Sequence, residues 1–336
     1  MDLAAGLAHV VETGVPGALG LAGHGSSVQT AAAGVAEAAA GSPLTPGHRF
    51  RIGSIAKTFV ATVVLQLVTS GRLRLSNSVE THLPGLVDRG GEITVRQLLN
   101  HTSGIPDYFS ACLSGDPRRI WTPRELVAAS RQEPRGEPRR WAYSNTNYVL
   151  LGLLIEAVTG TPVERELEQR IIEPLDLRST GSSNDAPVAR GYLAASNPIF
   201  PAEGSDPVDV TEVGSTWGWP KLVSSAEDVA RFFEGLLGGE LLPAAKVDAM
   251  LAGVESDWVE SDRYGLGIEE MSSLMGVSDS PHGPRWGHIG LGLGHTVVAL
   301  ASRDGRRRTV VMVNQGMLGD ETWRAIGDVV WAALDA

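Results

Sequence analysis

Ser54 and Lys57, three residues apart, are the first pair in this sequence whose types and spacing could perform nucleophilic catalysis. They open an apolar segment, residues 58–68, that is predicted to form a buried helix with both side chains on one face of its first turn. Ser54 is also predicted to cap this helix. A serine hydroxyl needs a nearby base, and a lysine in an apolar wall loses its charge readily. The alternative is a capped helix with a lysine that reaches toward solvent.

A second cluster, Tyr143-Ser144-Asn145, stands just before another apolar segment that begins near Asn147. A phenol close to an ammonium group has a lowered pKa and can act as a general base. The asparagine amide can donate to a substrate carbonyl and can also hold the lysine. The alternative is a tyrosine and an asparagine that only begin a helix.

A third cluster lies around His288, in the run Trp286-Gly287-His288-Ile289-Gly290-Leu291. Glycines allow the backbone to approach a ligand closely, so the N–H groups of Leu291 and Ser54 could form an oxyanion hole. His288 could relay a proton toward Tyr143 or supply charge. The alternative is a histidine at a strand end with its hydrogen bonds satisfied. His101 and His295 are predicted to be ordinary loop or strand residues.

The composition predicts a globular protein with a large core or two connected lobes. The chain has 336 residues, of which 43% are hydrophobic and 20% charged, and a formal net charge of −11. This charge argues against a nucleic-acid binder and suggests neutral or cationic partners. The single cysteine, Cys112, excludes an internal disulfide framework.

The first residues lack a basic stretch followed by an apolar core, and no segment reaches membrane-spanning length without charge. A cytoplasmic location without a membrane partner is therefore expected if residue 1 is the natural start. A chain trimmed of its signal peptide would look the same.

Periodicity and turn residues predict helices and strands at both ends of the chain and mostly helices between them. The predicted helices cover residues 1–14, 58–68, 93–99, 123–132, 147–159, 162–172, 225–237 and 320–334. The predicted strands cover residues 18–22, 28–33, 264–268, 294–301 and 308–314. This order predicts an α+β fold, with a discontinuous sheet domain (1–75 and 216–336), a mostly helical inserted domain (76–215) and the active site between them.

The three clusters together carry a family resemblance. Ser54-x-x-Lys57, Tyr143-x-Asn145 and His288-x-Gly290 stand in the order and rough spacing of the serine β-lactamase and penicillin-binding-protein superfamily. The pattern resembles class C β-lactamases and, most of all, the soluble D-alanyl-D-alanine carboxypeptidase, which also has a histidine in its third motif. The resemblance runs over nearly the whole chain and includes the phrases at 49–54, 93–104, 143–148 and 264–267. It implies the β-lactamase/transpeptidase-like fold.

The resemblance also implies an acyl-enzyme mechanism without a metal or organic cofactor. Ser54 would attack a carbonyl group, Lys57 and Tyr143 would together handle its proton, and Asn145 and His288 would complete the catalytic set. The backbone N–H groups of Ser54 and Leu291 would hold the oxyanion. The implied substrate is a small molecule or a peptide, and the oligomeric state is not predicted.

The sequence departs from the carboxypeptidase pattern where those enzymes bind the terminal carboxylate of their substrate. Glu269 stands where the resemblance would place an arginine, and Ile289 and Leu291 stand where it would place threonines. A carboxylate near Glu269 would be repelled, so the pocket is expected to prefer a neutral or positively charged ester or amide. The pocket is predicted to include Gly290 and apolar walls from four aromatic residues. These are Trp217, Trp219, Tyr108 and Phe109, each of which could instead belong to the core.

The leading functional hypothesis is therefore a β-lactamase-related serine hydrolase whose substrate lacks a recognised terminal carboxylate. One alternative is an acyltransferase in a biosynthetic pathway, in which a bound amine or alcohol intercepts the same acyl-enzyme. Another is a β-lactam-binding protein that acylates once without turnover. A true carboxypeptidase or β-lactamase stays open if other residues replace the missing carboxylate clamp.

Overall fold

An antiparallel sheet forms the centre of the computed structural model, which describes residues 2–114, 116, 118–182, 188–200, 204–214, 219–257 and 261–335. Within this part of the chain, nine strands follow the order β3-β2-β1-β15-β14-β13-β10-β9-β8. Their bounds are β1 Gly17–His24, β2 Ser27–Glu37, β3 Ser42–Pro43, β8 Val254–Glu255, β9 Arg263–Tyr264, β10 Glu269–Met271, β13 Arg285–Leu291, β14 Thr296–Ala301 and β15 Arg307–Val313. The first and last parts of the chain meet in the middle of the sheet, where β1 pairs with β15.

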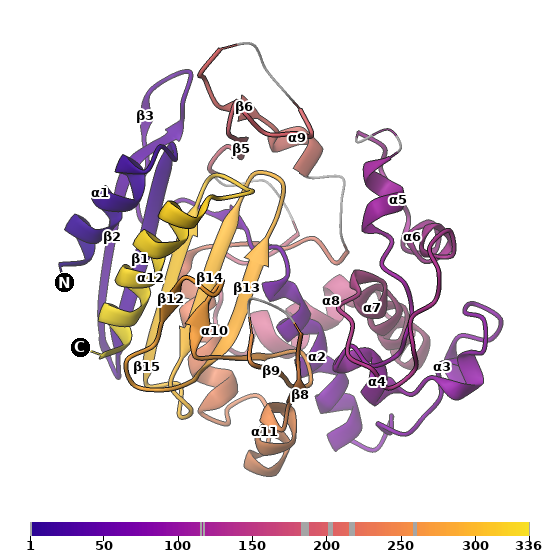
Figure 1. Cartoon of the computed structure of the whole chain (residues 1–336). Coiled ribbons are helices and arrows are strands. Elements are labelled where there is room, and N and C mark those ends of the chain that lie inside the picture. The colour runs from indigo at the N-terminus through magenta and orange to yellow at the C-terminus, as the bar shows by residue number, and fades with distance from the viewer. Residues whose placement is uncertain are drawn as a thin grey trace.

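Successive side chains on each central strand point to opposite faces of the sheet and belong to two separate hydrophobic cores. On β14, Val297 and Ala299 belong to one buried cluster, whereas Val298 and Leu300 belong to the other. The second cluster lies under α1 (Leu3–Glu12) and α12 (Asp320–Asp335), which run side by side over one face of the sheet (Figure 1). The predicted helices at the two ends of the chain therefore cover the same face.

The other face is covered by α2 (Ile55–Thr69) and α10 (Ala226–Leu237), whose apolar residues join the larger cluster. Ser225 caps α10 by accepting the N–H of Asp228 at 3.2 Å, as its sequence predicts. Twelve of the fifteen residues of α2 are buried, because the sheet lies on one side of it and α7 on the other. The apolar segment at 58–68 thus forms a helix buried on nearly all sides.

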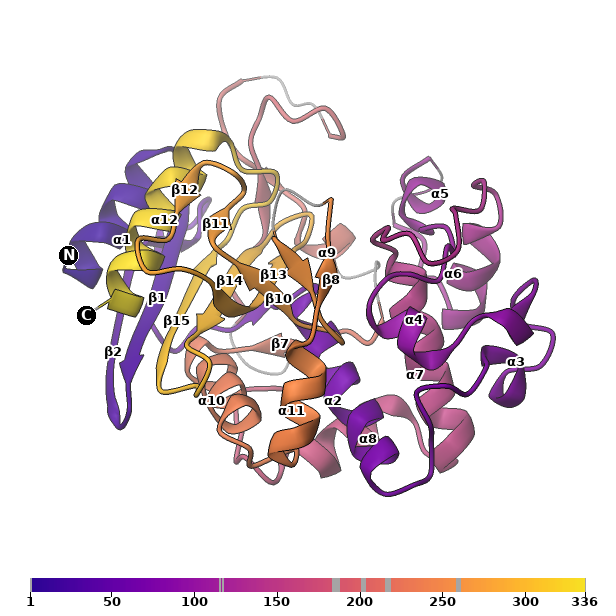
Figure 2. The ribbon, with the colours of Figure 1, turned by 60° about the horizontal axis from the view of Figure 1, so that its bottom comes forward.

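Most of the remaining helices gather beyond α2, on the side away from the sheet (Figure 2). They include α3 Val79–His82, α4 Val95–Leu99, α5 Phe109–Leu113, α6 Pro123–Ser130, α7 Asn145–Thr159, α8 Val163–Leu167 and a π-helical turn at Glu168–Ile172. A 3-10 turn covers Gly90–Glu92, and two further helices, α9 Thr211–Gly214 and α11 Ala244–Leu251, lie nearer the sheet. The exact boundaries of a helical inserted domain stay a prediction.

Three pairs of short strands complete the described structure. They are β4 Phe50–Arg51 with β7 Val223–Ser224, β5 Tyr192–Leu193 with β6 Val208–Asp209, and β11 Ser273–Leu274 with β12 Ser278–Asp279. The β4–β7 pair leads the chain directly into Ser54 at the start of α2. No helix among the described residues is both long and apolar enough to cross a membrane.

The predicted strand at 264–268 is wrong in its centre. Tyr264 ends β9 and Glu269 begins β10, while the residues between them form a tight turn closed by the Gly265 N–H and the Ile268 carbonyl at 2.8 Å. Gly267 has φ +82°, a conformation that L side chains rarely adopt. The two glycines therefore mark a turn between two strands rather than a strand interior.

Candidate active site

Ser54 lies at the N-terminus of α2, and its hydroxyl is held by two proton-bearing groups. Lys57 Nζ donates to Ser54 Oγ at 2.8 Å, and the Tyr143 hydroxyl donates to the same oxygen at 2.9 Å. Ser54 occupies the N-cap position, but its side chain makes no capping hydrogen bond. The predicted cap is therefore wrong, because the hydroxyl points to Lys57 and Tyr143 instead. The candidate nucleophile is therefore in contact with both candidate bases.

Asn145 fixes the position of Lys57, and Asp107 fixes the orientation of Asn145. Asn145 Oδ1 accepts from Lys57 Nζ at 2.7 Å, while its Nδ2 donates to Asp107 Oδ2 at 2.8 Å. A carboxylate accepts only, so the amide nitrogen must face Asp107 and the amide oxygen must face the lysine. Asp107 also accepts the backbone N–H of Asn145 at the start of α7. Burial raises the pKa of Asp107, and these hydrogen bonds oppose that rise.

His101 accepts hydrogen bonds from the two residues that flank Tyr143 in the chain. Its carbonyl accepts the N–H of Ala142 at 2.9 Å, and its Nδ1 accepts the N–H of Ser144 at 3.2 Å. Its ring lies against the ring of Tyr143, with 4.4 Å between centroids. His101 is fully buried and has φ +58°, so the surrounding structure maintains an unfavourable backbone conformation here. These contacts make His101 a positioning residue for Tyr143.

Replacing His101 by phenylalanine should lower kcat about 10- to 100-fold with little change in KM, because the new side chain fills the space but cannot accept the Ser144 N–H. The pH profile of kcat should also shift, since displacement of Tyr143 changes its distance to Lys57. Steady-state kinetics of an ester substrate from pH 5 to 10 measure both effects. His9→Phe on the exposed side of α1 is the matched control. A wild-type kcat and pH profile in His101→Phe would contradict the positioning role.

The end of β13 brings a backbone N–H toward Ser54. Gly292 N–H donates to the His295 carbonyl at 2.9 Å, and hydrogen bonds alternate along an antiparallel pair, so the N–H of Leu291 points away from β14. A Cβ on Gly53 would lie 3.0 Å from the Leu291 carbonyl, and one on Gly290 would lie 2.1 Å from the Ile52 carbonyl. These two glycines allow β13 to approach the start of α2. The N–H groups of Leu291 and Ser54 are thus positioned as candidate oxyanion donors.

His288 lies in the middle of β13, and its side chain belongs to a buried polar cluster. Its Nδ1 is 2.8 Å from the Ile289 carbonyl and 3.2 Å from Glu269 Oε1, so Nδ1 carries the hydrogen and Nε2 accepts from the Tyr264 hydroxyl at 3.1 Å. Burial lowers the pKa of His288 to about 3, and the imidazole is therefore neutral at physiological pH. A neutral, fully buried ring does not supply charge to the cavity. Through its hydrogen bond to Tyr264, it instead supports an aromatic ring that lies beside the ring of Tyr143.

A cavity of about 760 Å³ opens in front of Ser54. Its lining includes Lys57, Tyr143 and Asn145, and, from the predicted pocket, Ile289, Leu291, Trp219, Tyr108 and Phe109. Gly290 and Glu269 are not part of the lining: Gly290 packs on the backbone of Ile52, and Glu269 is only 1% exposed beside His288. Their placement in the substrate pocket is thereby corrected. Trp217 lies outside the described residues.

Sequence reasoning missed three residues that the structure places in or under the site, Asp107, His101 and Arg51. His101 was predicted to be an ordinary loop or strand residue, although it stands in the phrase at 93–104 that contributes to the family resemblance. Asp107 and Arg51 carry no local signal, because their contacts come from segments far away in the chain.

Comparison with known proteins shows the family and the fold of the chain. The family model described as Beta-lactamase matches residues 3–330. A D-stereospecific amidohydrolase from Streptomyces sp. is 34% identical with a TM-score of 0.80, covering 96% of each chain. The D-amino acid amidase from Ochrobactrum anthropi SV3, complexed with L-phenylalanine amide, is 26% identical with a TM-score of 0.86, covering 99% of this chain and 96% of the other.

Penicillin-binding protein 4* of Bacillus subtilis (strain 168) is 28% identical over 249 residues, which make up 70% of this chain. The match spans 55% of that protein, so this chain corresponds to little more than half the length of such relatives. The fold is thus the α+β, β-lactamase/transpeptidase-like fold, in agreement with the prediction from sequence.

Proposed function

The chain belongs to the Beta-lactamase family, and from this premise we propose that it is a serine hydrolase that cleaves small amides or esters of D-amino acids through an acyl-enzyme at Ser54. The observation that carries the proposal is the pair of hydrogen bonds from Lys57 and Tyr143 to one serine oxygen. The amide class is supported by the names of the two similar solved structures, a D-stereospecific amidohydrolase and a D-amino acid amidase.

The proposed reaction begins with attack of Ser54 Oγ on the substrate carbonyl carbon. The serine proton passes to the Lys57–Tyr143 pair, and the two distances, 2.8 and 2.9 Å, support treating the pair as one base. The carbonyl oxygen becomes an oxyanion between the N–H groups of Ser54 and Leu291. The positive end of α2 favours this negative charge.

The pair then returns its proton to the leaving nitrogen or oxygen, the bond to the carbonyl carbon breaks, and the acyl-enzyme remains. Water attacks the ester carbon in the second half of the cycle and gives its proton to the same pair. When the bond to Ser54 Oγ breaks, the serine regains a proton and the free acid leaves. In each half of the cycle, the pair therefore acts first as a base and then as an acid.

The wall beside the oxyanion donors supports a substrate without a carboxylate on its leaving group. Ile289 and Leu291 both line the cavity from β13, and their side chains cannot donate a hydrogen bond to a carboxylate. A primary amide, which releases ammonia, requires no such contact. We therefore still expect that the pocket does not recognise a terminal carboxylate next to the scissile bond. The reason is the apolar side chains of Ile289 and Leu291, and not repulsion by the carboxyl of Glu269.

Intact-mass measurement tests the nucleophile and the substrate class together. The wild type mixed with p-nitrophenyl acetate should gain one acetyl group that Ser54→Ala does not gain, and benzylpenicillin should acylate more slowly than the ester. Ammonia release should be faster with D-phenylalanine amide than with L-phenylalanine amide. Rapid acylation or hydrolysis of penicillin would instead support a β-lactamase or D,D-peptidase. Accumulated ester on addition of an alcohol would support the acyltransferase alternative.

A further inference from the structure

The cavity in front of Ser54 is positively charged although the protein as a whole is acidic. Among the described residues that line it, the basic ones are Arg51, Lys57 and Lys221, and the acidic one is Asp107. Asp107 is already engaged by both N–H groups of Asn145. The formal net charge of the whole chain is −11, so this concentration of cations is local. A cavity with such a lining attracts anions and raises their local concentration.

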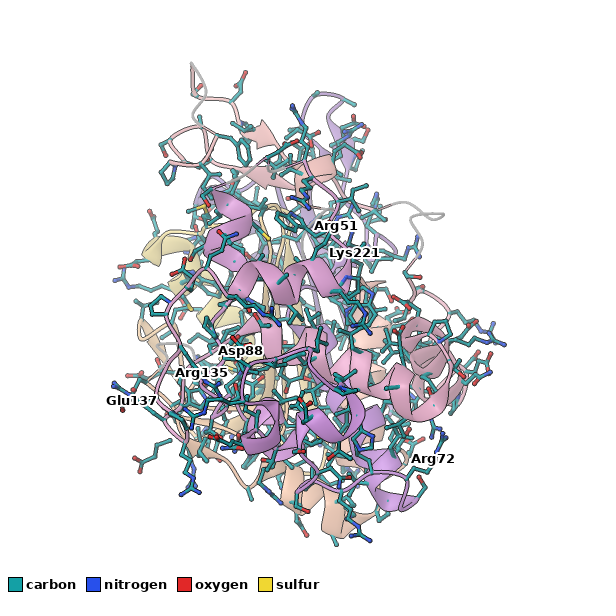
Figure 3. All side chains as sticks on the ribbon, turned by 90° about the vertical axis from the view of Figure 1, so that its right-hand side faces the viewer. Arg51, Arg72, Asp88, Arg135, Glu137 and Lys221 are labelled. Atoms are coloured by element: carbon teal, nitrogen blue, oxygen red, sulfur yellow. The ribbon has the colours of Figure 1, made fainter. Side chains whose placement is uncertain are left out.

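Arg51 lies on β4 and Lys221 stands two residues before β7, and both line the cavity. Arg51 pairs with Val223, and the Ile52 N–H donates to the Leu222 carbonyl at 3.1 Å, so the pairing continues toward Lys221. Figure 3 shows Arg51 and Lys221 next to each other on one side of the molecule.

The two cations are incompletely compensated by the described residues. Arg51 Nη2 makes one long hydrogen bond of 3.4 Å to the Thr211 carbonyl, and Arg51 Nε is buried without a partner among the residues that the structure describes. The carboxylate that acts on Arg51 is the exposed Glu212. Burial lowers the pKa of Lys221, and the positive charge of Arg51 lowers it further. Two partly buried like charges are unfavourable unless an anion lies between them.

We propose that Arg51 and Lys221 form an anion subsite that binds a carboxylate on the acyl portion of the substrate. The acyl side follows from the proposed function, on which this inference rests, because the leaving group of a primary amide is ammonia and carries no carboxylate. Arg51 precedes Ser54 by three residues, so their Cα atoms are at most about 10 Å apart, and the carboxylate lies a few bonds from the scissile carbonyl. A guanidinium fork and an ammonium group suit a carboxylate.

This assignment changes the expected charge of the substrate. The sequence analysis predicted repulsion of anions by Glu269, but that carboxyl is buried beside His288 and outside the cavity lining. The lining instead contains the two cations Arg51 and Lys221. The preferred substrate is therefore an amide or ester of an acid that carries a second carboxylate.

A pair of matched esters tests the subsite. The mono-p-nitrophenyl ester of adipic acid carries a carboxylate on its acyl chain, and p-nitrophenyl hexanoate has the same chain length without the charge. After subtraction of the rate with Ser54→Ala, the wild type should have a kcat/KM about tenfold higher for the adipate ester. This ratio should fall to near one in Lys221→Gln and below one in Lys221→Glu. It should also decrease with added NaCl.

Two controls keep the result specific. Lys246→Gln removes a lysine on α11, away from the cavity lining, and should leave the ratio and the rates unchanged. A second ester pair, 4-acetoxybenzoic acid and 4-acetoxybenzamide, places the carboxylate on the leaving group and should show no preference.

A ratio near one in the wild type, or one that Lys221→Gln does not change, would overturn the subsite. A preference confined to the leaving-group pair would also overturn it. If neither ester shows Ser54-dependent cleavage, the proposed function itself fails. That outcome is distinct, because the hexanoate ester reports the Ser54 chemistry without the anion subsite.

Discussion

Ser54→Ala is expected to abolish acyl-enzyme formation and to lower kcat on the order of 10⁴-fold or more. The alanine leaves Lys57 and Tyr143 in place but removes the oxygen to which both groups donate. Activity that remains would come from the oxyanion donors and from substrate binding alone. Intact-mass analysis with an activated ester and initial-rate kinetics on the same ester measure the two effects.

The fold should tolerate this change, since the hydroxyl of Ser54 makes no capping hydrogen bond to α2. The expected change in the free energy of unfolding is about 1–2 kcal/mol, for two lost hydrogen bonds. Ser70→Ala, at the exposed C-terminal end of the same helix, is the matched control and should retain full activity. An acetyl adduct that persists in Ser54→Ala would place the nucleophile elsewhere.

Gly290→Ala is expected to lower kcat about 10²- to 10³-fold, the usual cost of losing one oxyanion donor. The new Cβ would lie 2.1 Å from the Ile52 carbonyl oxygen and 3.0 Å from its carbon, and neither backbone atom can rotate away. The end of β13 must therefore move, and the N–H of Leu291 moves with it. The melting temperature should fall as well, because Ile52 and the neighbouring Ile55 are fully buried.

Gly292→Ala gives the matched control, two residues along the same strand end. A Cβ there would meet only the His295 carbonyl oxygen at 3.4 Å, an ordinary contact. This variant should keep kcat within a few-fold of the wild type, although Gly292 also lines the cavity. Circular dichroism confirms that each variant is folded before its kinetics are compared. Equal kcat values for the two variants would show that β13 does not need this close approach.

Much of the fold could be predicted from the sequence because the signals are local. The apolar runs that became α2 and α7 have the length and spacing of buried helices, and Gly160 ends α7 with φ +75° as a C-terminal glycine should. The predicted strands near 18–22 and 28–33 pair as β1 and β2. The turn at 265–267 was missed because a short apolar segment with two glycines has no clear period.

The candidate catalytic clusters were also predicted from the sequence, and the structure brings Ser54, Lys57, Tyr143 and Asn145 into contact. What the sequence did not contain is the environment of each group. Asp107 reaches Asn145 from a segment 38 residues away in the chain, and His101 reaches Ser144 from 43 residues away. Contacts between such distant segments depend on the packing of whole helices.

The sequence by itself predicted the fold, which the comparisons confirm, and it indicated Ser54 as the candidate nucleophile and Lys57 and Tyr143 as its candidate proton carriers, because residue types at short spacing are typical of that chemistry. Only the tertiary structure decided the charge of the substrate cavity. It buries Glu269 beside His288 and brings Arg51 and Lys221, 170 positions apart in the numbering, into the lining of one cavity. The physical reason is that strand register and burial decide which charges face the cavity, and both are properties of the packed chain.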